Sequence, residues 1–267
     1  MLESETIDII AHAYDEAERG RHRIRPPSVQ YKGFTIDDAY AVQRRWVELK
    51  VARGNPIKGR KIGLTSRAMQ RQAAIDEPDY GALMADMFYG TGSEIPMSRF
   101  LQPRLECELG FVLGRRLKGP NCTIFDVLSA ADYIVPACEI VDGRTHRIDP
   151  DTGKPRSVLD SIADNAGNAA LIVGGRPVKP MEVDLRWVSV LCHRNHVIEE
   201  TGVAAAVLNH PANGVAWLAN KLAPFDIALE PGDFVLGGSF TGMVEARSGD
   251  VFHVDYGPLG SISARFT

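Results

Sequence analysis

Helical patterns of apolar residues dominate the start of the chain, and strand-like patterns dominate the remainder. Residues 4–19 carry an apolar stripe at helical spacing and predict a helix that ends at Gly20. Thr35 is the expected N-cap of a second helix that runs to about Gly54. Further along, short strand patterns occur at residues 104–114, 134–142, 169–174 and 184–200, and helical patterns at 66–74, 124–133 and 211–223.

The arrangement of these elements favours antiparallel pairing. Arg194 and Asn195 lie between two strand patterns and predict a tight hairpin turn, and residues 233–267 predict several strands broken by glycines. Because strands outnumber the helices that could connect parallel neighbours, a doubly wound parallel sheet is disfavoured. We expect an α+β fold, with a small helical N-terminal part (residues 1–60) on a β-rich body that holds the functional site (residues 61–267).

Residues 104–113 alternate strictly between two kinds of side chain and contain two glutamates. Leucines, Cys107 and Phe111 occupy one parity, whereas Glu106 and Glu108 share the other, so both carboxylates leave one face of the predicted strand. Like charges at this spacing raise each other's pKa unless a positive charge lies between them. The pattern is equally typical of a solvated strand face and of a site for a divalent cation.

Glu139 is the one charged residue in the apolar run of residues 133–141, which predicts a buried strand. An isolated buried carboxylate is costly to ionise, so such groups are paired, metal-bound or protonated. A buried ion pair with an arginine is one explanation. A three-carboxylate cage with Glu106 and Glu108 for Mg²⁺ or Mn²⁺ explains all three glutamates together.

Three further segments are candidates for chemistry. Residues 58–66 are basic and rich in glycine, and Lys61 could hold a carboxylate or act as an acid, although an exposed basic turn gives the same pattern. Asp79 lies among turn residues, where aspartate most often caps the following helix. Residues 237–242 form a glycine-rich loop with hydroxyl groups that could bind an anion.

Composition narrows the class of protein. The chain has 267 residues, of which 45% are hydrophobic and 24% charged, as in ordinary globular proteins. The net charge of -4 argues against nucleic-acid binding, and no apolar run is long enough to cross a membrane, so we expect neither partner. The four cysteines are scattered, which disfavours disulfides and zinc. The N-terminus lacks a signal-peptide pattern, so we expect a cytoplasmic protein.

Together these segments resemble the hydratase/decarboxylase family of the fumarylacetoacetate hydrolase superfamily. The resemblance covers essentially the whole chain. It is carried by residues 58–66 (KGRKIGLTS), 77–83 (EPDYGAL), 106–108 (ECE), 119–123 (GPNCT), 164–166 (DNA), 197–204 (VIEETGVA), 209–220 (NHPANGVAWLAN) and 236–241 (LGGSFT).

The resemblance implies a fumarylacetoacetate-hydrolase-like mixed β-roll with peripheral helices, assembled as a homo-oligomer. It implies metal ligands at Glu106, Glu108 and Glu139, for Mg²⁺ or Mn²⁺, and proton transfer by Lys61 and Asp79. We expect a neighbouring cation to lower the pKa of Lys61. Candidate substrate-binding residues are Ser239, Thr241, Asp164 and Asn165.

The implied activity is water addition to a small 2-oxo-alkenoate dicarboxylate during the breakdown of aromatic compounds. Decarboxylation of a related 2-oxo acid, or hydration of the shorter 2-hydroxypenta-2,4-dienoate, remains open. A non-catalytic partner subunit of such a complex is a third alternative, which would not need all three glutamates and Lys61. A dicarboxylate requires a cation for its far end, and the arginines considered are Arg67, Arg104, Arg144 and Arg156.

Overall fold

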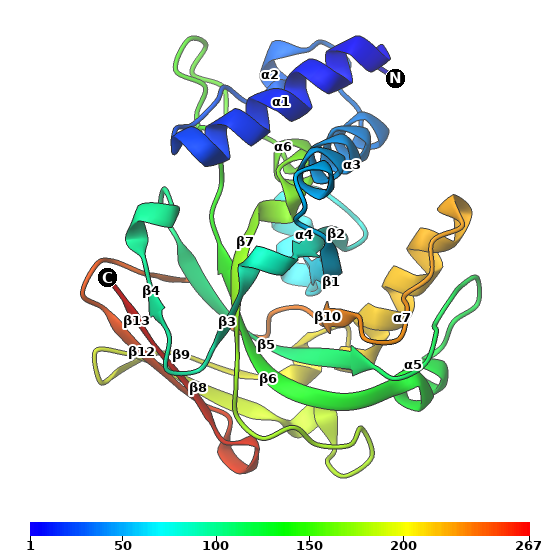
Figure 1. The fold of residues 1–267 in the computed structure, drawn as a ribbon, viewed down its shortest axis with the longest axis vertical. Coiled ribbons are helices and arrows are strands. Elements are labelled where there is room, and N and C mark those ends of the chain that lie inside the picture. The colour runs from blue at the N-terminus through cyan, green and yellow to red at the C-terminus, as the bar shows by residue number, and fades with distance from the viewer.

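Three helices gather at one end of the molecule, above the sheets (Figure 1). They are α1 (Ser4–Gly20), α2 (Pro27–Gln30) and α3 (Ile36–Ala52). The predicted cap is confirmed, because the Thr35 hydroxyl accepts a hydrogen bond from the Asp38 amide while the Asp38 carboxylate accepts one from the Thr35 amide. The rings of Tyr14 and Trp46 stack with centroids 5.8 Å apart and join α1 to α3.

A mixed sheet of eight strands forms the centre of the molecule, and the computed structural model describes all of residues 1–267. Its order is β2-β1-β10-β5-β6-β7-β3, and β11 also pairs with β5. The strands are β1 (Ile57–Gly63), β2 (Asp79–Met84), β3 (Phe88–Gly90), β5 (Arg104–Leu113), β6 (Ala131–Val141), β7 (Asn168–Val173), β10 (Phe234–Leu236) and β11 (Val244–Glu245). Within this sheet only the β1–β10 and β3–β7 pairs are parallel, as expected for a fold that is not doubly wound.

A second sheet of five strands packs beside the first, and the C-terminus ends on it (Figure 1). Its order is β4 (Glu94–Ile95), β13 (Ser261–Phe266), β12 (Val251–Asp255), β8 (Ser189–Arg194) and β9 (Val197–Val203). The predicted hairpin exists but its turn is one residue later than expected. Asn195 and His196 form it with φ of 53° and 70°, and Arg194 still belongs to β8. Asparagine tolerates this left-handed conformation better than arginine does.

The remaining helices are short and lie around the sheets. They are α4 (Arg67–Ala73), α5 (Ile124–Ala130), α6 (Val158–Ala163) and α7 (Pro211–Leu222). Single 3₁₀ turns occupy Ala85–Met87, Met97–Arg99, Asn165–Gly167, Leu185–Trp187, Ala204–Ala206, Ala223–Phe225 and Gly257–Leu259. No helix combines the length and the apolar character that a membrane span needs. The division of the chain near residue 60 into a helical part and a β-rich body stays a prediction.

The hydrophobic core includes three of the four cysteines. Cys107, Cys138 and Cys192 are buried free thiols, and Cys138 Sγ lies 3.8 Å from the Tyr256 hydroxyl. Tyr256 in turn donates a hydrogen bond of 2.6 Å to the Ala137 carbonyl, which links the connection after β12 to strand β6. These cysteines therefore pack as small apolar side chains with weak polar contacts.

Candidate active site

Three glutamates converge because strands β5 and β6 pair in one particular register. Glu106 lies directly opposite Glu139 in the antiparallel ladder, and Glu108 follows on the same face of β5. One carboxylate oxygen from each residue lies within 4.8 Å of the other two. Glu108 and Glu139 are each only 1% exposed. The solvated strand face considered from the sequence is therefore wrong, and this is a largely buried acidic cluster.

Burial and mutual repulsion hold protons on this cluster. Desolvation, followed by the charge of Glu139, raises the pKa of Glu106 to about 8. The same two causes raise the pKa of Glu108 well above its ordinary value. Without a cation beyond the neighbouring lysine, the cluster cannot carry its full negative charge near neutral pH.

The hydrogen bonds of the cluster leave oxygens that suit a metal ion. Glu139 Oε1 accepts a hydrogen bond of 2.8 Å from the Asn168 side-chain amide and lies 3.2 Å from Lys61 Nζ, whereas its buried Oε2 has no partner. Glu108 Oε2 accepts a hydrogen bond of 2.9 Å from the Gly238 amide. An oxygen-only donor set with excess negative charge and an unpartnered buried oxygen fits a hard divalent cation.

Lys61 belongs to a strand and not to an exposed basic turn, so the turn alternative is wrong. It lies within β1 and is 3% exposed. Burial alone would lower its pKa, but the surrounding carboxylates, Glu139 first among them, hold the pKa of Lys61 above its ordinary value. This raised pKa reflects the carboxylates of the chain itself, and the lowering expected from a neighbouring cation stays a prediction.

Asp79 begins β2 and caps no helix, which corrects the interpretation from turn residues. It is 4% exposed and pairs in register with Gly63 of β1. Burial raises the pKa of Asp79 to about 6, with the charge of Lys61 acting in the opposite direction. Its Oδ1 has no hydrogen-bond partner.

Gly63 makes the approach of these two groups possible. A Cβ at this position would lie 2.2 Å from Asp79 Oδ1 and 3.3 Å from Lys61 Nζ. Both polar groups therefore rest against a surface that only a glycine provides. Gly63 lies in the glycine-rich segment of residues 58–66, where nothing in the sequence distinguishes it from its neighbours.

The loop of residues 237–242 closes over the cluster. Besides the amide of Gly238, it supplies Ser239 and Thr241, which both line the cavity. Thr241 Oγ1 accepts a hydrogen bond of 3.1 Å from the Cys107 amide, and Ser239 Oγ donates one of 3.0 Å to the Thr241 carbonyl. The loop is thus hydrogen-bonded to β5, and its binding of an anion stays a prediction.

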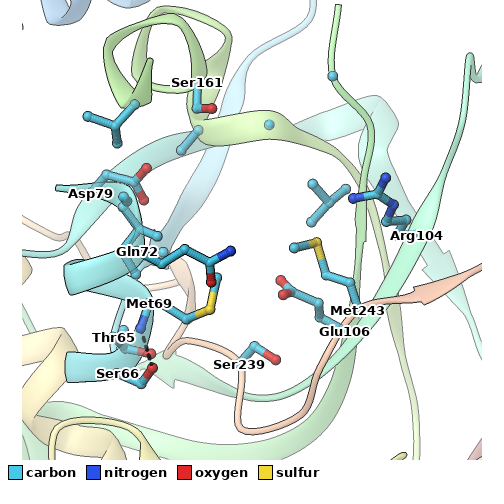
Figure 2. A pocket seen from close by; sticks show the side chains of 18 of the residues that line it. Thr65, Ser66, Met69, Gln72, Asp79, Arg104, Glu106, Ser161, Ser239 and Met243 are labelled. Atoms are coloured by element: carbon cyan, nitrogen blue, oxygen red, sulfur yellow. Dashed lines mark hydrogen bonds between the residues drawn. The ribbon is translucent and has the colours of Figure 1, made fainter. Parts of the chain in front are cut away.

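A cavity of about 710 Å³ contains most of the predicted site residues. Figure 2 shows Arg104, Met243 and Glu106 on one side, facing Met69 and Gln72 of α4 across the opening. Glu108, Lys61, Asp79 and Asp164 also line it.

The two other predicted substrate-binding residues have structural partners. Asp164 accepts hydrogen bonds from the backbone amide of Arg144 at 2.7 Å and from its guanidinium at 2.5 Å. Asn165 does not line the cavity. Its side chain bonds both the amide and the carbonyl of Ala82, at 2.7 and 2.8 Å, and so holds the 3₁₀ turn after α6 against β2.

Asn168 is a further residue in contact with the glutamate cluster, and it was not predicted from the sequence. It is fully buried at the start of β7, and its amide fixes Glu139 Oε1. A lone amide at the head of the apolar run 168–173 was the available signal. Buried polar groups need partners, and here the partner lies in the neighbouring strand β6.

Comparison with known proteins identifies the family of the chain. A sequence model described as fumarylacetoacetate (FAA) hydrolase C-terminal matches residues 51–267. The chain belongs to the fumarylacetoacetate hydrolase family. Within this family it is 62% identical over 266 residues to 2-oxo-hept-4-ene-1,7-dioate hydratase of Escherichia coli, with 100% of both chains covered. It is 37% identical over 256 residues to 2-keto-4-pentenoate hydratase of Paraburkholderia xenovorans, covering 96% of this chain and 93% of the relative.

A solved structure supports the same placement. 4-Oxalocrotonate decarboxylase from Pseudomonas putida G7, complexed with magnesium and adipate, superimposes with a TM-score of 0.94 at 36% identity, covering 100% of this chain and 99% of the other. The predicted fumarylacetoacetate-hydrolase-like fold of mixed sheets and peripheral helices is thereby confirmed.

Proposed function

We propose that this chain is a metal-dependent hydratase that converts 2-oxohept-4-ene-1,7-dioate into 4-hydroxy-2-oxoheptane-1,7-dioate during the breakdown of aromatic compounds. The observation that carries the proposal is the three-glutamate cluster, of which Glu106 and Glu108 line one cavity with Lys61 and Asp79, while Glu139 lies 3.2 Å from Lys61. The Escherichia coli relative, 62% identical over its whole length, bears the name of this hydratase.

Glu106, Glu108 and Glu139 would hold Mg²⁺ or Mn²⁺. Such an ion acts as a Lewis acid toward a 2-oxo acid that chelates it. The unpartnered Oε2 of Glu139 and the raised pKa of Glu106 support this assignment from the chain itself. The magnesium complex of the solved relative supports it by likeness.

Lys61 and Asp79 would move the protons. Water addition at C4 requires one proton to leave the water and another to reach a substrate carbon. Asp79 Oδ1 is unpartnered and its pKa of about 6 allows it to accept a proton near neutral pH. Lys61 lines the same cavity as Asp79, with its Nζ 3.2 Å from Glu139 Oε1, and we assign it as the proton donor. Burial of both groups keeps bulk water away from the transfer.

The test is the Glu108→Gln variant, assayed in the presence of Mg²⁺ by the ultraviolet absorbance of the substrate. We expect hydration to fall by at least about 100-fold, because one carboxylate ligand and its charge are lost. Glu94→Gln, at an exposed glutamate of β4, is the matched control and should retain activity. Undiminished hydration by Glu108→Gln would contradict the proposal, and so would full activity in excess chelator.

Decarboxylation is the second candidate, favoured by the TM-score of 0.94 to 4-oxalocrotonate decarboxylase. The shorter 2-hydroxypenta-2,4-dienoate is the third, favoured by the 37% identity to 2-keto-4-pentenoate hydratase. Loss of absorbance with release of carbon dioxide identifies decarboxylation, whereas loss without it identifies hydration. No reaction with any of these substrates would favour a non-catalytic subunit, against which the retention of Lys61 and all three glutamates argues.

We further propose that the chain forms a homo-oligomer. Val197 and Ile198, on the edge strand β9 of the five-stranded sheet, are exposed apolar residues, and so is Trp187 in the 3₁₀ turn before β8. Light scattering of the wild type and of Val197→Lys tests this, since a smaller species is expected for the variant. A cytoplasmic location stays a prediction.

A further inference from the structure

The cavity contains arginines as well as carboxylates. Arg23, Arg104, Arg147 and Arg156 all line it. A dicarboxylate bound through its 2-oxo-acid end must place its far carboxylate within the same cavity. Burying a carboxylate away from water costs free energy unless a cation pairs with it. One of these arginines is therefore expected to pair with the far carboxylate.

Two of the four arginines considered from the sequence are excluded by their positions. Arg67 is exposed on α4 and does not line the cavity. Arg144 is 2% exposed and committed to Asp164, and it also donates to the carbonyls of Asp164 and Asn168. Neither can reach a ligand without breaking buried contacts or moving its helix.

Within the cavity the other arginines already have partners or face solvent. Arg156 donates a hydrogen bond of 3.2 Å to the Thr145 hydroxyl, and Arg23 donates one of 3.2 Å to Gln102. Arg147 is exposed.

Arg104 is the one arginine of the four that combines three features. It is partly buried, and its guanidinium makes no hydrogen bond or ion pair in the structure. Its cross-strand neighbour Glu245 pairs instead with Arg247, at 3.4 Å. It stands two residues before Glu106 on the same face of β5, so the two Cα atoms are about 7 Å apart. Figure 2 shows its side chain beside Met243, on the side of the cavity that holds Glu106.

We infer that Arg104 binds the far carboxylate of the substrate and thereby selects dicarboxylates over monocarboxylates. The inference rests on the proposed function, because it places the 2-oxo-acid end of the substrate at the glutamate cluster. The strand fixes the spacing between the two ends of the ligand, since Arg104 and Glu106 belong to one continuous stretch of β5. Met243 beside the guanidinium supplies an apolar contact for the carbon chain between them.

Binding of two inert ligands tests the inference without relying on turnover. 2-Oxoheptanedioate and 2-oxoheptanoate lack the double bond and differ only in the far carboxylate. Calorimetry with Mg²⁺ present should show that the wild type prefers the diacid by about 10- to 100-fold, the range for a charge-assisted pair. Arg104→Gln should abolish the preference while binding the monoacid as the wild type does. Arg67→Gln, the exposed control on α4, should keep the preference.

A second measurement separates this role from support of the glutamate cluster. The affinity of Arg104→Gln for Mg²⁺ alone should equal that of the wild type, and Arg104→Lys should restore part of the diacid preference. Equal weakening of both ligands, weaker Mg²⁺ binding, or a wild type without diacid preference would each overturn the inference. A wild type that prefers the diacid but hydrates no substrate would instead refute the proposed function.

Discussion

Replacing Gly63 with alanine tests whether the position of the Asp79 carboxylate controls turnover. The added Cβ would lie 2.2 Å from Asp79 Oδ1, and ordinary contacts of this kind are longer than 3 Å, so the oxygen must retreat by about 1 Å. The Lys61 ammonium would lie 3.3 Å from the added Cβ, so it needs to move only slightly. A displacement of about 1 Å at a reacting group costs on the order of 100-fold in rate.

The assay is steady-state hydration of the substrate, with thermal unfolding measured with and without Mg²⁺. We expect Gly63→Ala to lower kcat by about 100-fold and to leave both KM and the stabilisation by Mg²⁺ unchanged, because the three glutamates are untouched. Gly90→Ala is the matched control, since a Cβ on this β3 residue meets nothing within 4 Å. A Gly63→Ala enzyme with wild-type kcat would refute the assignment of Asp79 to proton transfer. Loss of Mg²⁺ stabilisation would show that the glutamate cluster itself had moved.

Three further predictions concern groups at and beyond the cavity. Lys61→Met removes the proton donor, so kcat should fall by about 10²- to 10⁴-fold in the same assay while the protein still folds. Arg144→Leu leaves Asp164 buried without its cation and should cost about 3–5 kcal/mol in urea unfolding, whereas a cost near zero would refute a structural ion pair. Hydrogen bonds, first from Arg25 and then from Thr152, lower the pKa of Asp149. Its stabilising effect is therefore present at neutral pH and lost as the pH falls below about 4, so Asp149→Asn should show a flatter loss of melting temperature on acidification.

The residues of the acidic cluster could be predicted from the sequence, because the alternation along a strand determines which face a side chain leaves. Glu106 and Glu108 share a parity, and Glu139 is alone among apolar residues, so each could be identified from its neighbours. The register that sets Glu106 opposite Glu139 could not be predicted from the sequence, because it depends on how β5 and β6 pair across the 17 residues between them.

Strands β1 and β2 were missed for a different reason. The segment around Lys61 carries charges and glycines that are typical of an exposed turn, and Pro78 and Gly81 around Asp79 are typical turn residues. In the structure each segment is stabilised by its partner strand, and the polar side chains are stabilised by each other. Such compensation between distant residues leaves no local pattern in a single sequence.

Strands β5 and β6 and the connections that follow them differ in how freely their sequence can change. Every glutamate of the cluster lies within these two strands, and no residue between 114 and 130, where the strands are connected, lines the cavity. Insertions in that connection are therefore neutral for chemistry, whereas one residue inserted inside β6 would turn Glu139 to the opposite face. The next connection, from β6 to β7, supplies Arg147 and Arg156 to the cavity wall. Selection of the far carboxylate stays with Arg104 on β5, and we expect the remaining substrate range to diverge through that second connection while the β5–β6 hairpin is preserved.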